Sequence, residues 1–415
     1  MPEGILTKED NREAAEWLRG KARANIGVFS EMLPEIRARA FAVSGIEDMK
    51  RLARIQEAIA KVPEGGDWRE ARDRIAEETG GSEAQAENVL RTNAFQAYAA
   101  ARYRSQMGDT EVFPYLKYVT VGDDRVRDSH ARLNGTILRK DDPFWETHYP
   151  PWDWGCRCVA VELTEEMAQD EQAEGTGELR DKAWSEDYRA AHRGRDESKD
   201  YQFRPGSLEI GLDSAAVKGY DESGAPILRY DEETLRAFNE RMEKAVVELP
   251  DGRTKNVREW MWEPVVEKAK KALAKAGAKD GREHAAVLDR NTGATIPHAV
   301  KKSDAGHVSI EYHLKAWQTV DVLHNHPPFD PSLSPQDVIS AFDTHVREVG
   351  CTSLSGGMRL QVLSKDPRVL ARVRRFDERL KAARTAAERR SAFDEWLSFV
   401  RAMNMTGVFK AEGLE

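Results

Sequence analysis

The sequence predicts an α+β protein of several domains: a helical N-terminal region with a small β-containing domain, then a C-terminal α/β domain flanked by helices. Three observations support this class. The chain has 415 residues, and roughly 150 residues per domain predicts about two or three domains. Apolar residues recur at three- and four-residue steps through residues 9–107, as in amphipathic helices. Residues 115–161 begin with a β-branched and aromatic run, and the chain becomes strand-like again near residue 280.

Turn residues divide the chain into segments. Gly80 and Gly81 interrupt the N-terminal helical pattern, and Ser82 is expected to cap the helix that follows. A Pro-Asp-Gly turn separates two helical stretches at 231–247 and 256–277. The expected segments are a helical N-terminal region (1–110), a small motif domain (111–165), a linker or surface extension (166–230), a helical connector (231–279), an α/β domain (280–365) and C-terminal helices (366–415).

The composition excludes several classes of protein. A net charge of −9 argues against a protein whose whole surface binds nucleic acid. Three cysteines are too few for a disulfide scaffold and suit a reducing compartment. No apolar run approaches 18 residues, so we expect no membrane span. The N-terminus lacks a basic region followed by an apolar core, so we expect no secretory signal.

The histidines are concentrated in one part of the chain. Seven of the ten lie between His284 and His345, where even spacing would place about 1.5. Within this region His324 and His326 follow a short apolar run readable as a strand, and residues two apart point to one face of a strand. Asp337 follows in the first turn of a helix expected to run until Gly350. Two imidazoles and one carboxylate would leave a fourth position open on a tetrahedral zinc ion.

Each half of this pattern also has an ordinary explanation. The segment from Ser334 to Asp337 reads as a plain helix start, since Ser is a good cap and Asp suits the third helical position. A His-x-His pair alone is common at surfaces and turns. Together with the local enrichment in histidine, the two halves favour a metal site.

The spacing His-x-His, seven residues, Ser, two residues, Asp resembles the JAMM metallopeptidase motif, and His324-Asn325-His326-Pro327 resembles its bacterial RadC-like branch. The resemblance covers about residues 280–365. It implies that His324, His326 and Asp337 bind zinc and that Ser334 stabilises the oxyanion. Glu283 matches the place of the family's general base, although a glutamate before a strand can equally be a solvated loop charge.

This resemblance implies a zinc-dependent metallopeptidase that cleaves peptide or isopeptide bonds. Zinc lowers the pKa of its bound water from 15.7 towards about 7. Glu283 would take the proton and return it to the leaving amine, while Ser334 would donate to the developing oxyanion. The sequence leaves the substrate open.

A second motif lies between residues 122 and 158. It resembles the phage Mu F-like head-morphogenesis family, also called minor head or minor capsid proteins, and with the preceding helix the resemblance covers about residues 20–165. Many members carry a histidine where this chain has Asp153. The matching residues are Arg91-Thr92-Asn93, Gly122-Asp123-Asp124-Arg125-Val126-Arg127, His130, Leu133, Gly135, Asp142-Pro143-Phe144-Trp145, Pro150-Pro151 and Gly155-Cys156-Arg157-Cys158.

The same motif offers a second set of metal ligands. Cys156 and Cys158 on an extended segment would point their thiols one way, and His130 and His148 could complete a zinc or structural cluster. A disulfide between residues two apart would be strained. We favour two small buried thiols instead. They would lie beside a hydrophobic wedge of Trp145, Trp152 and Trp154.

The Mu F-like resemblance implies a virion protein inside the capsid, present in the host cytoplasm during assembly, with portal and major capsid proteins as partners. Packaged DNA and ejected proteins are further candidate partners. The basic stretch in residues 372–390 favours a solvated helix face over DNA contact. The leading hypothesis is a minor head protein that carries a JAMM-like zinc hydrolase. Its alternatives are a purely structural capsid protein with a structural metal site, and a toxin-like effector delivered with the DNA.

Overall fold

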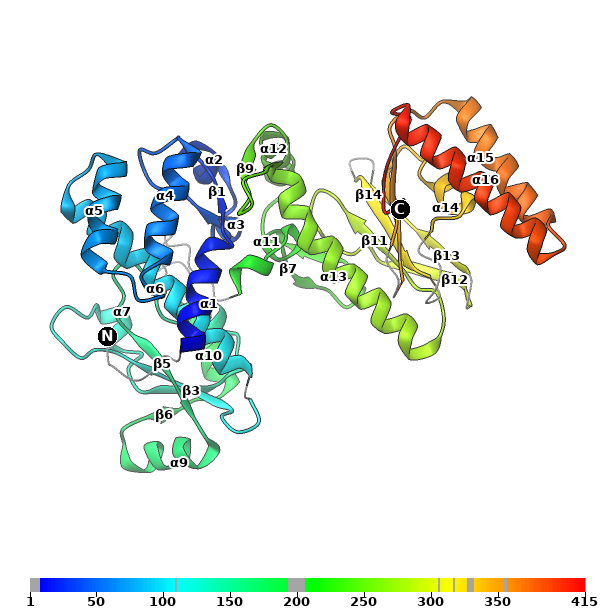
Figure 1. Ribbon diagram of the computed structural model, residues 1–415. Helices are drawn as coiled ribbons and strands as arrows, with labels where there is room; N and C mark the ends of the chain where they lie inside the picture. Colours follow the sequence, from blue (N-terminus) through cyan, green and yellow to red (C-terminus); the bar gives the residue numbers. More distant parts are fainter. Residues whose placement is uncertain are drawn as a thin grey trace. The chain divides into compact units, whose positions relative to one another are not determined.

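The computed structural model describes residues 8–108, 110–192, 206–304, 307–315, 318–326, 332–353 and 357–414. It confirms a mixed α+β protein of more than one domain, with several small sheets (Figure 1). Unit 1 comprises Met1–Ile210 and Arg241–Val257, and unit 2 comprises Gly211–Glu240 and Arg258–Glu415. Among the described residues, no helix combines the length and the apolar character that a membrane crossing needs.

Helices form most of the first half of unit 1, and polar caps begin several of them. Asp48 accepts from the Arg51 amide at the start of α4, Asp67 caps α5, and Ser82 Oγ accepts from Gln85 N at the start of α6, as expected. Later in the unit, Thr164 caps α9. The helices are α1 (Lys8–Arg19), α2 (Ile26–Glu31), α3 (Pro34–Arg37), α4 (Met49–Ala60), α5 (Trp68–Thr79), α6 (Glu83–Gly108), α7 (Asp128–Ala131), α8 (Phe144–His148), α9 (Glu165–Glu174), α10 (Lys182–His192) and the 3₁₀ helix η1 (Ser207–Glu209).

Two four-stranded sheets complete unit 1. The first has the order β10-β9-β1-β2 and the second β5-β3-β4-β6. In the second sheet β3 lies between two antiparallel neighbours. The strands are β1 (Ala22–Arg23), β2 (Ala40–Phe41), β3 (Tyr115–Val119), β4 (Thr136–Arg139), β5 (Val159–Leu163), β6 (Glu178–Leu179), β9 (Val246–Glu248) and β10 (Thr254–Asn256).

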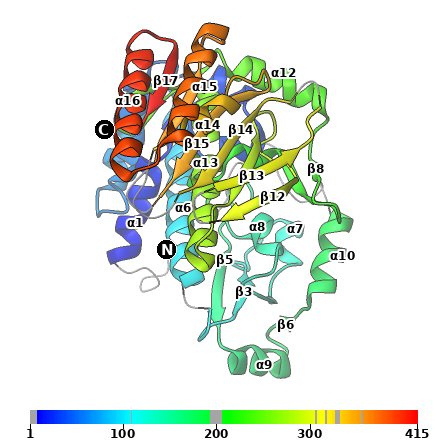
Figure 2. The ribbon, with the colours of Figure 1, turned by 90° about the vertical axis from the view of Figure 1, so that its right-hand side faces the viewer.

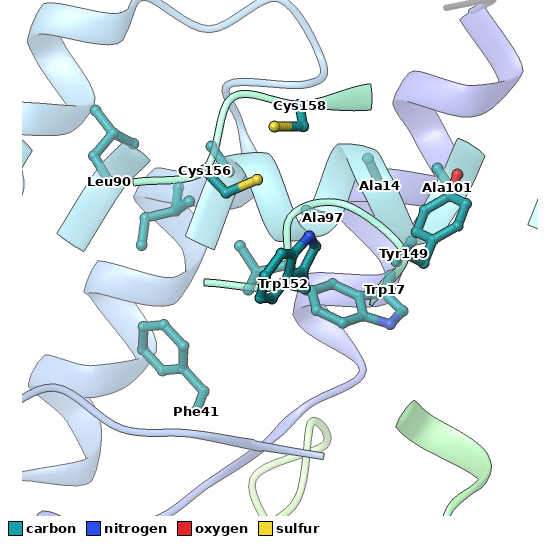
Figure 3. Packing of buried hydrophobic residues seen from close by; sticks show 14 of the residues in the cluster. Ala14, Trp17, Phe41, Leu90, Ala97, Ala101, Tyr149, Trp152, Cys156 and Cys158 are labelled. Carbon is teal, nitrogen blue, oxygen red and sulfur yellow. The ribbon is translucent and has the colours of Figure 1, made fainter. Parts of the chain in front are cut away.

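One apolar cluster joins the helices of unit 1 to this second sheet. Alanines of α6 pack against Trp17, Tyr149 and Trp152 (Figure 3). Small side chains let the long helix approach its neighbours closely, which suits a tightly packed core. Trp145 is also buried, but Trp154 is 41% exposed, so the expected three-tryptophan wedge is wrong in its third member.

Unit 2 is built around the five-stranded sheet β11-β14-β15-β16-β17, in which only β14 and β15 pair in parallel. Figure 2 shows this sheet in a view turned by 90° from that of Figure 1. The strands are β7 (Val217–Tyr220), β8 (Pro226–Leu228), β11 (Ala285–Asp289), β12 (His298–Asp304), β13 (His307–Tyr312), β14 (Val320–Asn325), β15 (Val346–Thr352), β16 (Arg359–Val362) and β17 (Phe409–Glu412). The helices are α11 (Leu212–Ala216), α12 (Glu232–Met242), α13 (Val257–Asp280), α14 (Pro335–Ser340), α15 (Pro367–Ala382) and α16 (Ala386–Met405).

The expected helix from Pro335 to Val349 is wrong in its second half. Helix α14 ends at Ser340, and Val346–Thr352 forms β15 instead. The apolar spacing fits both structures, but β15 pairs with β14 over its whole length, and this tertiary pairing overrides the helical period. The strand-like stretch expected after residue 280 begins with β11, and an isolated bridge joins Leu288 to Thr295.

The main sheet of unit 2 is covered on both faces, by α13 on one side and by α15 and α16 on the other (Figure 1). Strand β14 therefore has no solvent-exposed face. Towards α13 it presents Asp321, whose carboxylate accepts from Trp262 Nε1 at 2.8 Å and lies 3.3 Å from Arg290 Nη1. Burial raises the pKa of Asp321, and the nearby Arg290 opposes that rise. The arginine also lies over the Trp262 ring at 4.5 Å.

Removing one partner of this buried pair should destabilise unit 2. Asp321→Ala removes the strand partner of the buried Arg290, which keeps Glu259 at 2.6 Å, and leaves Trp262 Nε1 without its acceptor, which we expect to cost about 1–3 kcal/mol. The measurement is the free energy of opening of the β14 amides by hydrogen exchange in the full chain. The control is Asp394→Ala on the exposed face of α16, expected within about 0.5 kcal/mol of the parent. Equal effects of both variants would contradict this account.

Candidate functional site

The end of β14 brings two imidazoles together. His324 and His326 lie two residues apart, so alternation places both on the face of the strand opposite Asp321. Their Nε2 atoms are 2.8 Å apart. At that distance one ring donates a proton that the other accepts, or both face the same ion.

Asp337 approaches this pair from the first turn of α14. Its Oδ1 lies 3.5 Å from His324 Nε2. Its Oδ2 accepts from Ser334 N at 2.8 Å and from Ser334 Oγ at 2.6 Å, within a complete capping box. The two sequence interpretations of Asp337 are therefore compatible, because one oxygen caps the helix while the other faces the histidines.

Glu283 completes the cluster from the segment before β11. It is buried, and one of its carboxylate oxygens lies within 4.8 Å of a ring nitrogen of His324 and of His326. Its carbonyl oxygen accepts from Ser303 Oγ at 2.6 Å. The solvated-loop interpretation of Glu283 thus does not describe its surroundings.

Asn325 holds the Glu283 segment, and the sequence analysis did not single it out. Its Oδ1 accepts from His284 N at 2.6 Å and its Nδ2 donates to Arg282 O at 3.0 Å, one residue on either side of Glu283. Helix α13 approaches so closely that a Cβ at Gly277 would lie 2.2 Å from Asn325 Nδ2. A polar residue between two histidines on a strand was the available signal, because its side chain must enter the opposite buried face.

Trp396 supports Asp337 from the C-terminal helices. Its buried indole donates from Nε1 to Leu333 O at 2.8 Å, directly before Ser334.

Other histidines of the histidine-rich region do not join this site. His284 bonds Asp280, His298 bonds Ile296 O, and His345 bonds Gln318 O. The enrichment in histidine therefore has more than one cause.

A second cluster lies in unit 1. His130 Nδ1 is 3.6 Å from both Cys156 Sγ and Cys158 Sγ. The contact with Cys156 lowers the pKa of the Cys158 thiol to about 5, while the same contact raises the pKa of Cys156. His148 is not part of this group: it stacks on Phe144 at 4.7 Å.

The fold and both clusters can now be compared with known proteins. Residues 53–161 match the family of phage Mu protein F like proteins. A Mu-like prophage FluMu F protein of Haemophilus influenzae is 48% identical over 105 residues, which is 25% of each chain. A putative capsid assembly protein F of Escherichia phage Mu is 27% identical over 274 residues, 56% of this chain and 62% of that protein. No solved structure matches significantly.

These matches confirm the Mu F-like resemblance for the matched residues, which include both cysteines and His130. The chain spans about a quarter of one curated relative and less than two thirds of the other. The matched family region ends at residue 161, before the sheet that carries His324. The family match therefore does not cover the unit 2 cluster.

Asn325→Ala should release the Glu283 segment. Losing the acceptor of the His284 amide is expected to raise the exchange rate of that amide about 10-fold, because one net hydrogen bond contributes about 1–1.5 kcal/mol. Hydrogen exchange followed by mass spectrometry measures this change. Asn325→Asp is the matched control, since it keeps an acceptor for His284 N and should keep most of the protection. An unchanged exchange rate of the His284 amide in the alanine variant would contradict the proposed role of Asn325 in holding the Glu283 segment.

Proposed function

We propose that this chain is a phage head-assembly protein whose C-terminal unit is a JAMM-like, metal-dependent peptidase. The family match over residues 53–161 and the capsid-assembly name of the phage Mu relative support the head-assembly part. One observation carries the peptidase part. Residues from three separate segments converge at the end of β14; they are Glu283, His324, His326, Ser334 and Asp337.

The ligand atoms of His324, His326 and Asp337 suit a divalent metal ion such as zinc. In a tetrahedral site with bonds of about 2.0–2.2 Å, an imidazole nitrogen and a carboxylate oxygen lie roughly 3.3–3.5 Å apart. The distance between His324 Nε2 and Asp337 Oδ1 is 3.5 Å. The two ring nitrogens, 2.8 Å apart, need to separate by about half an ångström for the same geometry. His324, His326 and Asp337 would hold the ion, which acts as a Lewis acid and makes nearby water acidic.

The chain's own residues supply the proton transfers in this proposal. Glu283 is buried beside the imidazole pair, where its carboxylate accepts a proton from water and returns it to a leaving amine. Ser334 has two tasks, because its Oγ already donates to Asp337. It fixes the carboxylate first, and it stabilises a developing oxyanion only when its hydroxyl turns away from Asp337.

A structural metal site is the second candidate. The observation that favours it is the complete capping box, which engages both Ser334 and Asp337 within the helix turn. Such a site would bind the same ion with the same two histidines but would cleave nothing. Glu283 distinguishes the two functions, because a structural site would use it as a fourth ligand and lose affinity for the ion in Glu283→Gln, whereas a peptidase would keep the ion and lose cleavage.

In the virion, we propose that unit 1 associates with portal and major capsid proteins inside the head, after assembly in the host cytoplasm. The family match falls entirely in unit 1, and this match supports placing the assembly contacts there. The substrate of unit 2 would then be a protein that meets the head during assembly or infection.

Glu283→Gln should separate metal binding from catalysis. We expect unchanged zinc content and at least about a 100-fold loss of cleavage, the usual contribution of a general base. His324→Ala with His326→Ala should lose one equivalent of zinc and all cleavage, whereas His298→Ala should lose neither. Mass spectrometry of bound metal and cleavage of purified head proteins are the measurements. A zinc content of the double variant equal to that of the parent chain would refute the site, and cleavage unaffected by Glu283→Gln would refute its mechanism.

Unit 1 should determine incorporation into heads. Trp145 is buried and donates from Nε1 to Arg139 O, so Trp145→Ala should destabilise the unit by about 3–5 kcal/mol and deplete the chain from purified heads. Trp154→Ala is the matched control because its side chain is exposed. Glu283→Gln should be incorporated normally. Quantitative immunoblotting of purified heads measures how much of each variant is incorporated. Equal incorporation of all three variants would argue against this role of unit 1.

A further inference from the structure

Three buried side chains of unit 1 meet around one point without forming a disulfide. Cys156 and Cys158 lie just before β5, and His130 lies in α7. In Figure 3 the side chains of Cys156 and Cys158 point their sulfur atoms toward each other. All three ligand atoms lie within 4.8 Å of one another.

The distances between these atoms match a metal site as well as they match hydrogen bonds to sulfur. Zinc bonds of about 2.3 Å to sulfur and 2.0–2.1 Å to nitrogen, at a tetrahedral angle, separate nitrogen and sulfur by about 3.6 Å. His130 Nδ1 is 3.6 Å from each sulfur atom. A single ring proton cannot point at two acceptors equally well, whereas one shared ion accounts for both equal distances.

The surroundings of His130 are those of a metal-bound imidazole. Its ring stacks on Trp152, with centroids 4.0 Å apart and planes 9° apart, which fixes the ring plane. Its other nitrogen, Nε2, is buried and lies 3.9 Å from Asp153 Oδ2, with no hydrogen-bond partner among the described residues. A carboxylate beyond the second nitrogen is the usual partner that orients a metal-bound histidine.

Two further contacts close the site. The Tyr118 hydroxyl from β3 lies 3.2 Å from His130 Nδ1 and accepts from Trp152 Nε1 at 2.8 Å. Arg157, between the cysteines, forms a two-point ion pair with Asp123 at 2.6 and 2.7 Å, which holds the segment in place. Both cysteines also line a cavity of about 280 Å³.

We propose that His130, Cys156 and Cys158 bind a divalent metal ion such as zinc, which holds α7 and the segment before β5 against β3. Two thiolates and an imidazole select soft divalent ions. Three protein ligands leave a fourth position on a tetrahedral ion, and the burial of the site beside the Trp152 ring limits the access of solvent to it. Asp153 orients His130 from outside the coordination sphere. The site is independent of the peptidase proposed for unit 2.

Cobalt separates this site from the one in unit 2, because only thiolate ligands give an intense near-ultraviolet charge-transfer band. The full-length chain loaded with Co²⁺ should show that band. Cys156→Ser and Cys158→Ser should each lose it. Cys351→Ser, and His324→Ala combined with His326→Ala, should keep it. A missing band in the parent chain, or a band that follows Cys351, would overturn the proposal.

The unsubstituted chain provides a test that does not depend on the folding of variants. Removing zinc with a chelator should lower the thermal midpoint of unit 1, and adding zinc should restore it. Asp153→Asn should weaken zinc binding about 10- to 100-fold while keeping the cobalt band, and the exposed Asp124→Asn should not. An unchanged midpoint on chelation, or a Cys156–Cys158 disulfide in the purified chain, would refute the site.

Discussion

The parallel pairing of β14 with β15 is the constraint on which unit 2 depends. It places β14 inside a sheet that helices cover on both faces, so every polar side chain on the strand needs a buried partner. Towards α13, Asp321 pairs with Arg290 and Trp262, while Asn325 clamps the segment that holds Glu283. On the other face, His324 meets Asp337. The same strand thus builds the core on one side and the candidate site on the other.

The two clusters differ in chemistry in a way that suits different tasks. In unit 1 the ligands are two thiolates and an imidazole fixed by a stacked tryptophan, an arrangement that favours rigidity. In unit 2 the ligands are two imidazoles and one carboxylate, with a further buried carboxylate, Glu283, within reach. Hydrolysis requires such a proton acceptor, whereas in a structural site the same carboxylate would be the fourth ligand of the ion.

Local signals such as caps, periodicity and spacing predicted the α+β class, the long N-terminal helices and the grouping of His324, His326 and Asp337, whereas Glu283 and the role of Ser334 came from the JAMM resemblance. The local signals failed where the tertiary context decides. The apolar spacing of Val346 and Val349 fits helix and strand equally, and only pairing with β14 selects the strand. Trp154 resembles its buried neighbours in sequence but is exposed. The supporting roles of Asn325 and Trp396 depend on contacts with segments about 40 and 60 residues away, which no local pattern encodes.

The path of the chain bears on whether unit 2 is an exchangeable module. After Ile210 the chain contributes Gly211–Glu240 to unit 2, returns to unit 1 for Arg241–Val257, and then leaves again. The returning segment contains β9 and β10, and β9 pairs with β1. Buried Arg23 bonds both Glu248 and Leu249 O there. Replacing everything after Ile210 would therefore strip two strands from a sheet of unit 1 and leave Arg23 without these partners. An effector domain that varies freely would be joined at one boundary, so this interleaved path argues against the exchange of unit 2 as a single piece.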